Sequence, residues 1–435
     1  MQTSKVAIVI VTWNKKAFVL ELLNSLQHLN YPNYDVIVVD NFSSDHTFEA
    51  IAEYFPNTIV INNPENTGGA GGFNIGLQYA QDNGYEYCWL LDNDVVVESD
   101  ALLHLVNTLE SSLETSICGS QILIAGTDII QECGGDIDWN NSKVRLISHG
   151  KSKISKRPDK NVLEVDYCAA CSMLVRMSDI IAFGKIDPDM FIFWDDIEWS
   201  TRIKTFGKKI FCNTNSVVWH HFNGYKPSNV WRVYYRVRNK LYFFNKYSKS
   251  KSAVAKLLAI YEELQEFYHY MGIVDYSYSV ESAITDFKND IRGKWPSQAN
   301  IPTTATHFKP DIIPDNNYLV IYDHNYGQLS YSAFGDNTIH YVIDTNLSAT
   351  KFSLALLKSI IKPSIAVGNQ LNIFMLFSSF AILLTENGSR VIKNSKIKNT
   401  AFIIYRCIFL LENISLNLNE NCFLMQAPLY AKGRH

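Results

Sequence analysis

The stretch Leu90-Leu91-Asp92-Asn93-Asp94-Val95 places two carboxylates, one residue apart, at the point where an apolar run stops. The aromatic and apolar residues from Tyr85 to Leu91 predict a buried strand. Open α/β sheets bind their ligands in a crevice at the carboxyl ends of the strands, so we expect Asp92 and Asp94 to face such a crevice. Two hard oxygen ligands there suit a Mg²⁺ or Mn²⁺ ion that bridges a diphosphate. The stretch therefore favours an enzyme that uses a nucleotide-activated donor.

Short apolar runs alternate with helical patterns over residues 4–115. Strands are predicted at 6–11, 34–40, 58–62 and 85–91, and helices at 16–29, 45–54 and 72–83. This alternation predicts a mostly parallel sheet with helices on both faces. Polar residues follow each strand, and the loops that carry them should open at one edge of the sheet. These polar residues are Thr12 and Asn14, the run 40–45, the glycine-rich run 66–72, and Asp92 to Asp94.

The composition is that of a folded globular protein. Of the 435 residues, 47% are hydrophobic and 19% are charged, enough material for two or three domains. A net charge of −4 gives no basic field that would indicate nucleic-acid binding. The eight cysteines are scattered, and no cleavable signal peptide opens the sequence, so we expect reduced thiols and a cytoplasmic location. No window holds eighteen uninterrupted apolar residues, so we expect no membrane span.

Three carboxylates stand among aromatic residues in the stretch Phe191-Ile192-Phe193-Trp194-Asp195-Asp196-Ile197-Glu198-Trp199. Burying such charges is costly. Desolvation raises the pKa of a carboxyl group and a nearby cation lowers it, so this environment can tune a general base. The stretch also suits a helix N-terminus, where Asp195 or Asp196 caps the helix and Glu198 pairs with Arg202. The two interpretations are compatible, because one carboxylate can cap while another faces a substrate.

Two further motifs contain residue types that bind metals. His220 follows the apolar run 217–219, where it could be a metal ligand or an ordinary packing residue. The pair Cys168-Ala169-Ala170-Cys171 could be a redox pair or half of a zinc site. No second such pair exists, and this one lies in an apolar strand pattern over 165–175. We therefore expect both thiols to pack in the core.

Together these pieces resemble a known family. The stretches Ile10-Val11-Thr12-Trp13-Asn14, 39–45 and 91–94 resemble the family 2 inverting glycosyltransferases of GT-A fold. More narrowly, the stretches 66–73, 194–198 and 219–220 resemble bacterial galactofuranosyltransferases and the rhamnosyltransferases close to them. The resemblance covers roughly residues 4–245. It implies an α/β fold in which a Rossmann-like nucleotide-sugar-binding domain of GT-A type carries a helical extension and a small C-terminal α/β module.

The resemblance also implies a role for each matching residue. Donor-binding residues would be Thr12 and Asp40 at the nucleoside, and Asn66, Gly69 and Gly72 at the ribose, diphosphate or donor sugar. Asp92 and Asp94 would bind a ribose or sugar hydroxyl and a Mn²⁺ or Mg²⁺ ion, and His220 would complete the metal site. Asp196, with Asp195 beside it, would deprotonate the acceptor hydroxyl, and Trp194 would stack on the acceptor sugar. The middle residue of the Asp-Asn-Asp motif, Asn93, is often Asp in galactofuranosyltransferases, which reduces the charge at the metal by one.

We therefore expect a metal-dependent inverting glycosyltransferase that moves galactofuranose from UDP-galactofuranose to a growing surface polysaccharide, of the lipopolysaccharide O-antigen or capsule type. The alternative within the class is a rhamnosyltransferase that uses dTDP-rhamnose. A nucleotidyltransferase also places paired carboxylates at a sheet edge, but the run 66–72 lacks the basic residue that would bind a triphosphate. A non-catalytic scaffold with a nucleotide fold is the remaining alternative.

Three domains are expected: a catalytic domain over 1–226, a helical region over 227–305, and a small α/β module over 310–435. The run 231–256 holds eight Lys and Arg residues and no Asp or Glu. It could seat the enzyme on an anionic membrane surface near a lipid-linked acceptor, or form a helix with buried aromatics and solvated cations. The module is predicted to contain strands at 318–322, 340–344 and 381–385 and a helix at 348–361. Because it lacks catalytic signals, we expect it to form a homo-oligomer or to dock a partner transferase.

Overall fold

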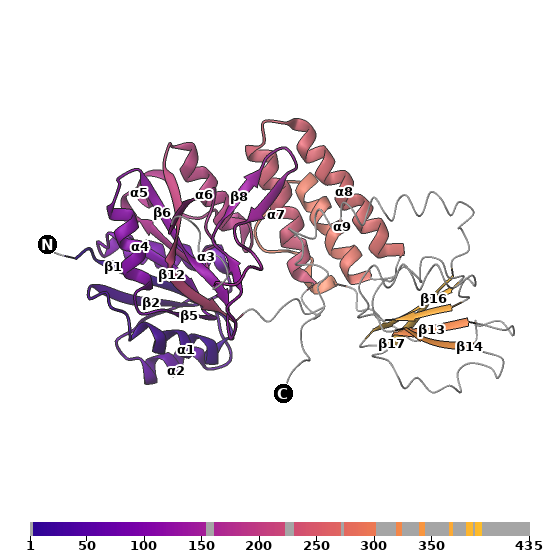
Figure 1. The fold of residues 1–435 in the computed structure, drawn as a ribbon, viewed down its shortest axis with the longest axis horizontal. Coiled ribbons are helices and arrows are strands. Elements are labelled where there is room, and N and C mark those ends of the chain that lie inside the picture. Colours follow the sequence, from indigo (N-terminus) through magenta and orange to yellow (C-terminus); the bar gives the residue numbers. More distant parts are fainter. Residues whose placement is uncertain are drawn as a thin grey trace. The chain divides into compact units, whose positions relative to one another are not determined.

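The computed structural model describes residues 3–153, 161–221, 230–270 and 274–301, together with five strands between residues 319 and 393 (Figure 1). The described residues form two units. The first contains 3–262 and 279–299, and the second contains the rest of the helical stretch 263–278 and the five strands. The elements that carry the predicted site all belong to the first unit.

Four parallel strands form the half of the main sheet that was predicted from the sequence. They are β1 (Val6–Thr12), β2 (Tyr34–Asp40), β3 (Ile59–Asn62) and β4 (Tyr87–Asp92), in the spatial order β4-β1-β2-β3. The register pairs Thr12 with Asp40 across β1 and β2, and Val11 with Asp92 across β1 and β4. The polar residues at the strand ends therefore meet at one edge of the sheet, as predicted.

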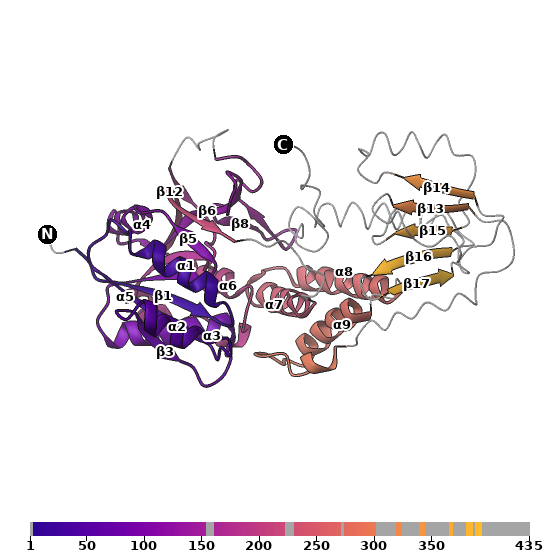
Figure 2. The same ribbon diagram turned by 90° about the horizontal axis from the view of Figure 1, so that it is seen from below.

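Helices cover both faces of this sheet (Figure 2). Alternate residues of β1 point to opposite faces, as a strand requires. Ile8 and Ile10 pack with α1 (Lys16–Leu26) and α4 (Ala101–Glu110), whereas Ala7 and Val9 pack with α3 (Gly68–Asp82). The short helix α2 (Thr47–Tyr54) adds Ile51 to the first of these cores.

The other half of the sheet is mixed and not simply parallel. It contains β5 (Val95–Val97), β6 (Thr115–Ile124), β7 (Ile130–Glu132), β10 (Val162–Glu164), β11 (Ser172–Arg176) and β12 (Lys209–His220). β11 runs antiparallel to both β4 and β6. β12 runs parallel to β6 and antiparallel to β5, which brings the end of β12 beside the residues that follow β4. The strand predicted over 165–175 was wrong in extent, because only its last part is extended.

The remaining helices are α5 (Met177–Phe183), α6 (Asp195–Thr205) and the longer α7 (Trp231–Tyr247), α8 (Lys251–Tyr270) and α9 (Val274–Lys288). A hairpin of β8 (Gly135–Asp138) and β9 (Lys143–Leu146) completes the first unit. α7 buries most of its aromatic residues, and Arg238 and Lys240 are buried with them. These two cations of the basic run therefore do not contribute to a charged surface.

The second unit contains a five-stranded sheet of β13 (Leu319–Asp323), β14 (Ile339–Ile343), β15 (Ile365–Gly368), β16 (Phe380–Thr385) and β17 (Gly388–Lys393). The order is β14-β13-β15-β16-β17, with only the pair β16–β17 antiparallel among these strands. β13, β14 and β16 correspond to the three predicted strands, while the helix predicted at 348–361 lies outside the described residues. No helix in the described part of the chain is both long and apolar enough to cross a membrane.

Candidate active site

Thr12 and Asp40 lie side by side at the carboxyl edge of the sheet, and both are buried. The Thr12 hydroxyl accepts a hydrogen bond from the Asn93 side chain at 3.0 Å. The Asp40 carboxylate accepts one from the backbone N–H of Ser43 at 3.0 Å. These bonds fix both side chains and tie the loop after β4 to the end of β1.

The glycine-rich run is not the loop that the sequence suggested. It forms the start of α3, which begins at Gly68, four residues before the predicted start. Gly68 has a φ of +75°, and a Cβ there would lie 2.1 Å from the Phe191 carbonyl oxygen. The same oxygen accepts a hydrogen bond from the Ala70 N–H at 3.1 Å. Only glycine permits this close approach between α3 and the segment before α6.

The other two glycines behave differently. A Cβ at Gly72 would lie 2.6 Å from a methyl group of Val11, so the absence of a side chain there lets α3 pack closely on β1. A Cβ at Gly69 would meet no other atom within 4 Å. Gly72 thus has a packing role in the fold, while Gly69 faces open space in which a ligand could approach the backbone.

A network of amides fixes the turn that leads into α3. The Asn41 side chain donates to the Asn66 side-chain oxygen at 3.1 Å and to the Gly68 carbonyl at 3.0 Å. Its own oxygen accepts from the Asn63 side chain and from the Thr67 N–H. Asn66 in turn accepts from the Gly68 N–H at 2.9 Å. Of these residues, the sequence indicated Asn66 as a site residue but not Asn41 or Asn63.

The two carboxylates after β4 meet His220 at the end of β12. Asp94 Oδ1 lies 3.2 Å from His220 Nε2, and the backbone N–H of His221 donates to the Asp94 carbonyl at 2.8 Å. His220 Nδ1 donates to the Gln131 side-chain oxygen at 2.8 Å. This second bond fixes the ring and directs Nε2 toward Asp94.

The pKa values in this group reflect burial and mutual charge. Desolvation, together with the charge of Asp94, raises the pKa of Asp92 to about 6. Desolvation also opposes ionisation of Asp94, but the hydrogen bond and charge of His220 outweigh it and hold the pKa of Asp94 below its ordinary value. Desolvation acts to lower the pKa of His220, but the hydrogen bond to Asp94 and the charges of Asp94 and Asp92 outweigh it and raise that pKa. Two carboxylates and an imidazole in this arrangement are a suitable donor set for a divalent cation.

A thiol borders this group as well. Ligand atoms of Asp92, Cys171 and His220 all lie within 4.8 Å of one another. Both cysteines of the Cys168–Cys171 pair are buried, as predicted, but Cys171 lies beside Asp92 and His220. Sequence reasoning missed this position of Cys171, because it depends on β11 lying antiparallel to β4.

The segment that precedes α6 is strained. Phe191, Phe193 and Trp194 have φ angles of 63°, 65° and 69°, each of which costs a non-glycine residue about 1–3 kcal/mol. Asn239 of α7 compensates, since its side-chain NH₂ donates to the carbonyls of Met190, Ile192 and Phe193 at 2.8, 2.9 and 2.8 Å. The adjacent residue of α7 supports the same segment: buried Arg238 donates to the Asp189 carbonyl at 3.2 Å.

Asp195 and Asp196 begin α6, and the strained segment directs them into the site. Asp196 accepts hydrogen bonds from the Ala170 N–H at 3.3 Å and from the Ile197 N–H at 2.8 Å. Desolvation nevertheless raises the pKa of Asp196 to about 6. Desolvation and the charge of Asp196 raise the pKa of Asp195 as well. The charge of Asp196 also raises the pKa of Asp92, so the two acidic centres are close enough to interact.

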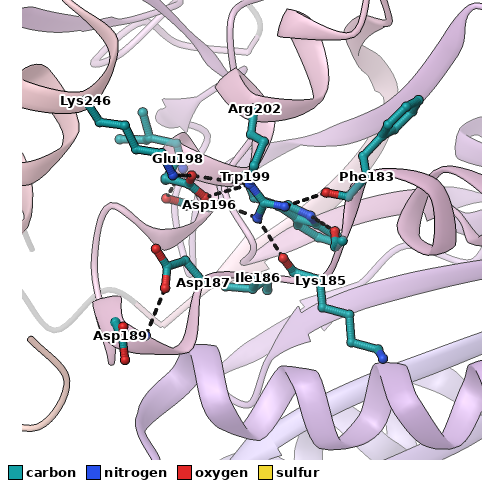
Figure 3. A network of polar contacts seen from close by, with 12 residues as sticks. Phe183, Lys185, Ile186, Asp187, Asp189, Asp196, Glu198, Trp199, Arg202 and Lys246 are labelled. Atoms are coloured by element: carbon teal, nitrogen blue, oxygen red, sulfur yellow. Dashed lines mark hydrogen bonds and ion pairs between the residues drawn. The ribbon is translucent and has the colours of Figure 1, made fainter.

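Glu198, the third carboxylate of the motif, has a structural role. It is fully buried and binds Arg202 at 3.2 Å and Lys246 of α7 at 2.8 Å (Figure 3). Arg202 also donates to the carbonyls of Phe183 and Lys185 at 2.6 Å each. The predicted pair of Glu198 and Arg202 is confirmed, and it joins α6 to α5 and α7.

Two other features of the site were missed from the sequence. Glu132 is buried beside Gln131 and accepts a hydrogen bond from the Tyr167 hydroxyl at 3.2 Å. Desolvation and the charge of Asp196 raise the pKa of Glu132 to about 8. Trp194 belongs to an aromatic cluster that also contains Trp139, Phe243 and Phe244, with ring centroids 5.3–5.9 Å apart. Trp139 is 37% exposed, so this cluster, which includes the neighbour of Asp195, reaches the surface.

The chain is similar to proteins that transfer sugars. The poly-β-1,6-N-acetyl-D-glucosamine synthase of Staphylococcus epidermidis is 28% identical over 113 residues, which are 26% of this chain and only 27% of that protein. The rhamnosyltransferase WbbL of Escherichia coli (strain K12) is 25% identical over 224 residues, covering 47% of this chain and 79% of WbbL. Among solved structures, the mannosyltransferase PcManGT from Pyrobaculum calidifontis, in complex with GDP-Man and Mn²⁺, is 17% identical with a TM-score of 0.41 over 69% of this chain and 79% of that chain.

Residues 7–178 match the family model described as glycosyl transferase family 2. This match covers β1 to β4 and the carboxylates that follow them, but it ends before α6. The mixed α/β sheet, with its polar strand ends at one edge, agrees with the fold expected for that family. Residues 7–178, less than half of the chain, therefore resemble a glycosyltransferase family 2 domain.

Proposed function

We propose that the chain is a metal-dependent inverting glycosyltransferase that transfers a sugar from a nucleotide-sugar donor to a hydroxyl group of a growing surface polysaccharide. The observation that carries the proposal is the position of Asp196. It is a carboxylate with a raised pKa, fixed by two backbone N–H groups, and its charge acts on Asp92 at the edge of the sheet.

The edge of the sheet offers a place for the donor. Thr12 and Asp40 would hold the nucleoside, and Asn66 with the partly exposed Gly69 would lie against the ribose and diphosphate. The start of α3 supports this placement, because a helix N-terminus favours negative charge. Gly72 remains near the diphosphate in this proposal, but its packing on Val11 already explains why it is a glycine.

Asp92, Asp94 and His220 would hold the divalent cation, Mn²⁺ or Mg²⁺. Such an ion would neutralise the charge that develops on the departing nucleoside diphosphate. The chain's own contribution is to hold the three ligands in place. Gln131 accepts from His220 Nδ1 and so leaves Nε2 directed toward Asp94, as a metal-binding histidine requires.

In the transfer step, Asp196 would take the proton from the acceptor hydroxyl. The oxygen would form a bond to the anomeric carbon on the face opposite the diphosphate, as the bond to the diphosphate oxygen breaks. A carboxylate with a pKa near 6 is ionised at neutral pH yet more basic than an ordinary aspartate, which suits a general base. A single displacement inverts the anomeric configuration and needs no covalent nucleophile.

Two donors remain candidates, each favoured by a different observation. The motifs of residues 66–73 and 194–198 resemble galactofuranosyltransferases, which favours UDP-galactofuranose. The similarity to a rhamnosyltransferase over 79% of that protein's length favours dTDP-rhamnose. Because that similarity is longer than the family match, we place dTDP-rhamnose first.

The test is a transfer assay with Mn²⁺ that compares dTDP-rhamnose, UDP-galactofuranose, UDP-galactopyranose and UDP-glucose, each with and without EDTA. We expect turnover of one of the first two donors and its loss with EDTA. Asp196→Asn should abolish transfer while donor binding, measured by calorimetry, persists. Asp82→Asn, which removes an exposed carboxylate of α3, is the control and should leave both unchanged. Unchanged turnover in Asp196→Asn would remove the base assignment and favour another group.

A further inference from the structure

We propose that Cys171 is a sulfur ligand for soft divalent cations such as Cd²⁺ and Zn²⁺, which it would bind together with Asp92 and His220. The inference deepens the metal site of the proposed glycosyl transfer and rests on that function for its location in the active site. It assigns to one catalytic centre two overlapping donor sets, one for hard cations and one for soft cations.

Ligand atoms of Asp92, Cys171 and His220 lie within 4.8 Å of one another. In the described part of the chain, no other three His, Cys, Asp or Glu side chains come together this closely. The donor atoms of a tetrahedral zinc site, at about 2.0–2.3 Å from the ion, lie about 3–4 Å apart. Side-chain movements of about 1 Å would therefore convert the observed group into a coordination site.

The backbone holds Cys171 in this place. Cys171 immediately precedes β11, and Ser172 lies opposite Leu91 in the antiparallel pairing of β11 with β4. The Asp92 N–H donates to the Cys171 carbonyl at 3.3 Å. The sulfur is thus anchored beside Asp92 by sheet pairing and does not depend on the flexibility of a loop.

Divalent cations differ in the ligands that they prefer. Mg²⁺ and Mn²⁺ prefer oxygen ligands, so they would use Asp92, Asp94 and His220 and leave the thiol of Cys171 protonated. Zn²⁺ and Cd²⁺ favour thiolate. Their binding would form a metal–sulfur bond and release the thiol proton to water. We therefore expect soft cations to compete with Mn²⁺ for the same centre and to inhibit transfer.

Cys168 provides a matched control three residues away. It is also buried, but its thiol donates to the Phe211 carbonyl at 3.2 Å and packs against Gly119. It has no place in the group formed by Asp92, Cys171 and His220. A substitution of Cys168 therefore removes a buried thiol from the same part of the fold without touching the proposed site.

The experiment is a titration of the full chain with Cd²⁺, followed by the ultraviolet charge-transfer absorption of cadmium–thiolate bonds. We expect the band in the wild type and in Cys168→Ser, and its loss in Cys171→Ser. The Cd²⁺ affinity of Cys171→Ser should fall by at least the roughly 10–100-fold that loss of an outer-shell partner costs a metal site. Mn²⁺ affinity, measured by electron paramagnetic resonance, should stay unchanged because the hard donor set is intact.

Asp92→Asn is a second variant that retains the thiol, and it should weaken both Cd²⁺ and Mn²⁺ binding. An unchanged band in Cys171→Ser, or an equal loss in Cys168→Ser, would overturn the proposal. The readout is independent of the proposed function. A Cys171-dependent band in a protein that transfers no sugar would preserve the metal site and refute the reaction. Sugar transfer without such a band would support the proposed reaction and refute the role of Cys171 as a metal ligand.

Discussion

Gly68 and Gly69 are neighbours at the start of α3, yet the same substitution should affect them in opposite ways. Alanine at Gly68 must adopt a left-handed φ, at about 1–2 kcal/mol, and its Cβ would lie 2.1 Å from the Phe191 carbonyl. Relieving that overlap requires the backbone before α6 to move, at a further 1–3 kcal/mol or so. We expect Gly68→Ala to lose about 2–5 kcal/mol of unfolding free energy, which is roughly 5–15 °C in melting temperature.

Alanine at Gly69 meets no atom within 4 Å, so the fold should tolerate it or gain up to about 1 kcal/mol from the better helix former. If the donor diphosphate lies against this backbone, the added methyl group should instead weaken donor binding by about 1–3 kcal/mol, roughly 5- to 150-fold in Kd. Thermal unfolding and calorimetry with the nucleoside diphosphate measure the two effects separately. Equal stability loss in both variants, or normal nucleotide binding by Gly69→Ala, would refute the reasoning.

Four other predictions concern the site. Asn239→Ala should lower the free energy of unfolding by about 2–4 kcal/mol, because it leaves buried carbonyls before α6 without donors. The control Asn245→Ala, on the exposed side of the same helix, should lower it by less than about 0.5 kcal/mol. Urea unfolding of both variants measures the difference. The wild-type kcat/KM should rise with pH through about 6 as Asp196 ionises. The pKa of Asp196 in the folded state exceeds its ordinary value of 3.8, so ionisation of this group destabilises the fold as the pH rises above about 4. Asp196→Asn should therefore be more stable than the wild type at pH 7 and lose that advantage below about pH 4. Thermal melts that show the same difference in stability at every pH would contradict this. Gln131→Leu should weaken Mn²⁺ binding about 10–100-fold by releasing His220, and normal affinity in a Mn²⁺ titration would count against that role.

The parts of the site that the sequence predicts are those that depend on local order. Strand periodicity and the polar residues after each strand placed Thr12, Asp40 and Asp92 at a common edge, and the register of β1 with its neighbours confirms it. The start of α3 was missed because glycines disfavour helices in general. Here they are tolerated because Gly68 and Gly72 each allow a close contact that another residue would block.

The parts that the sequence could not predict depend on pairing between distant segments. Gln131 reaches His220 only because β7 pairs with β6, which lies beside β12. Cys171 reaches Asp92 only because β11 reverses direction against β4. An apolar strand pattern does not indicate whether the neighbouring strand will run parallel or antiparallel. The sequence therefore does not predict that Gln131 and Cys171 lie in the site.

The contacts of Asn239 and Arg238 bear on where the catalytic unit can be cut. A chain shortened at residue 226, the boundary expected from the sequence, would keep every strand of the main sheet and both carboxylates of α6. It would nevertheless lose the side chains that hold three left-handed residues in place, and Arg238 itself depends on the Gly293 carbonyl at 2.7 Å.

Such a fragment should still bind nucleotide, since that half of the sheet is intact, but without an aligned base. We therefore expect a fragment active in transfer to extend to at least Trp295, whose backbone N–H donates to the Tyr235 hydroxyl of α7 at 2.8 Å. If the proposed roles hold, nucleotide recognition and bond formation depend on different lengths of chain, and residue 226 would be a poor point at which to exchange halves between related enzymes.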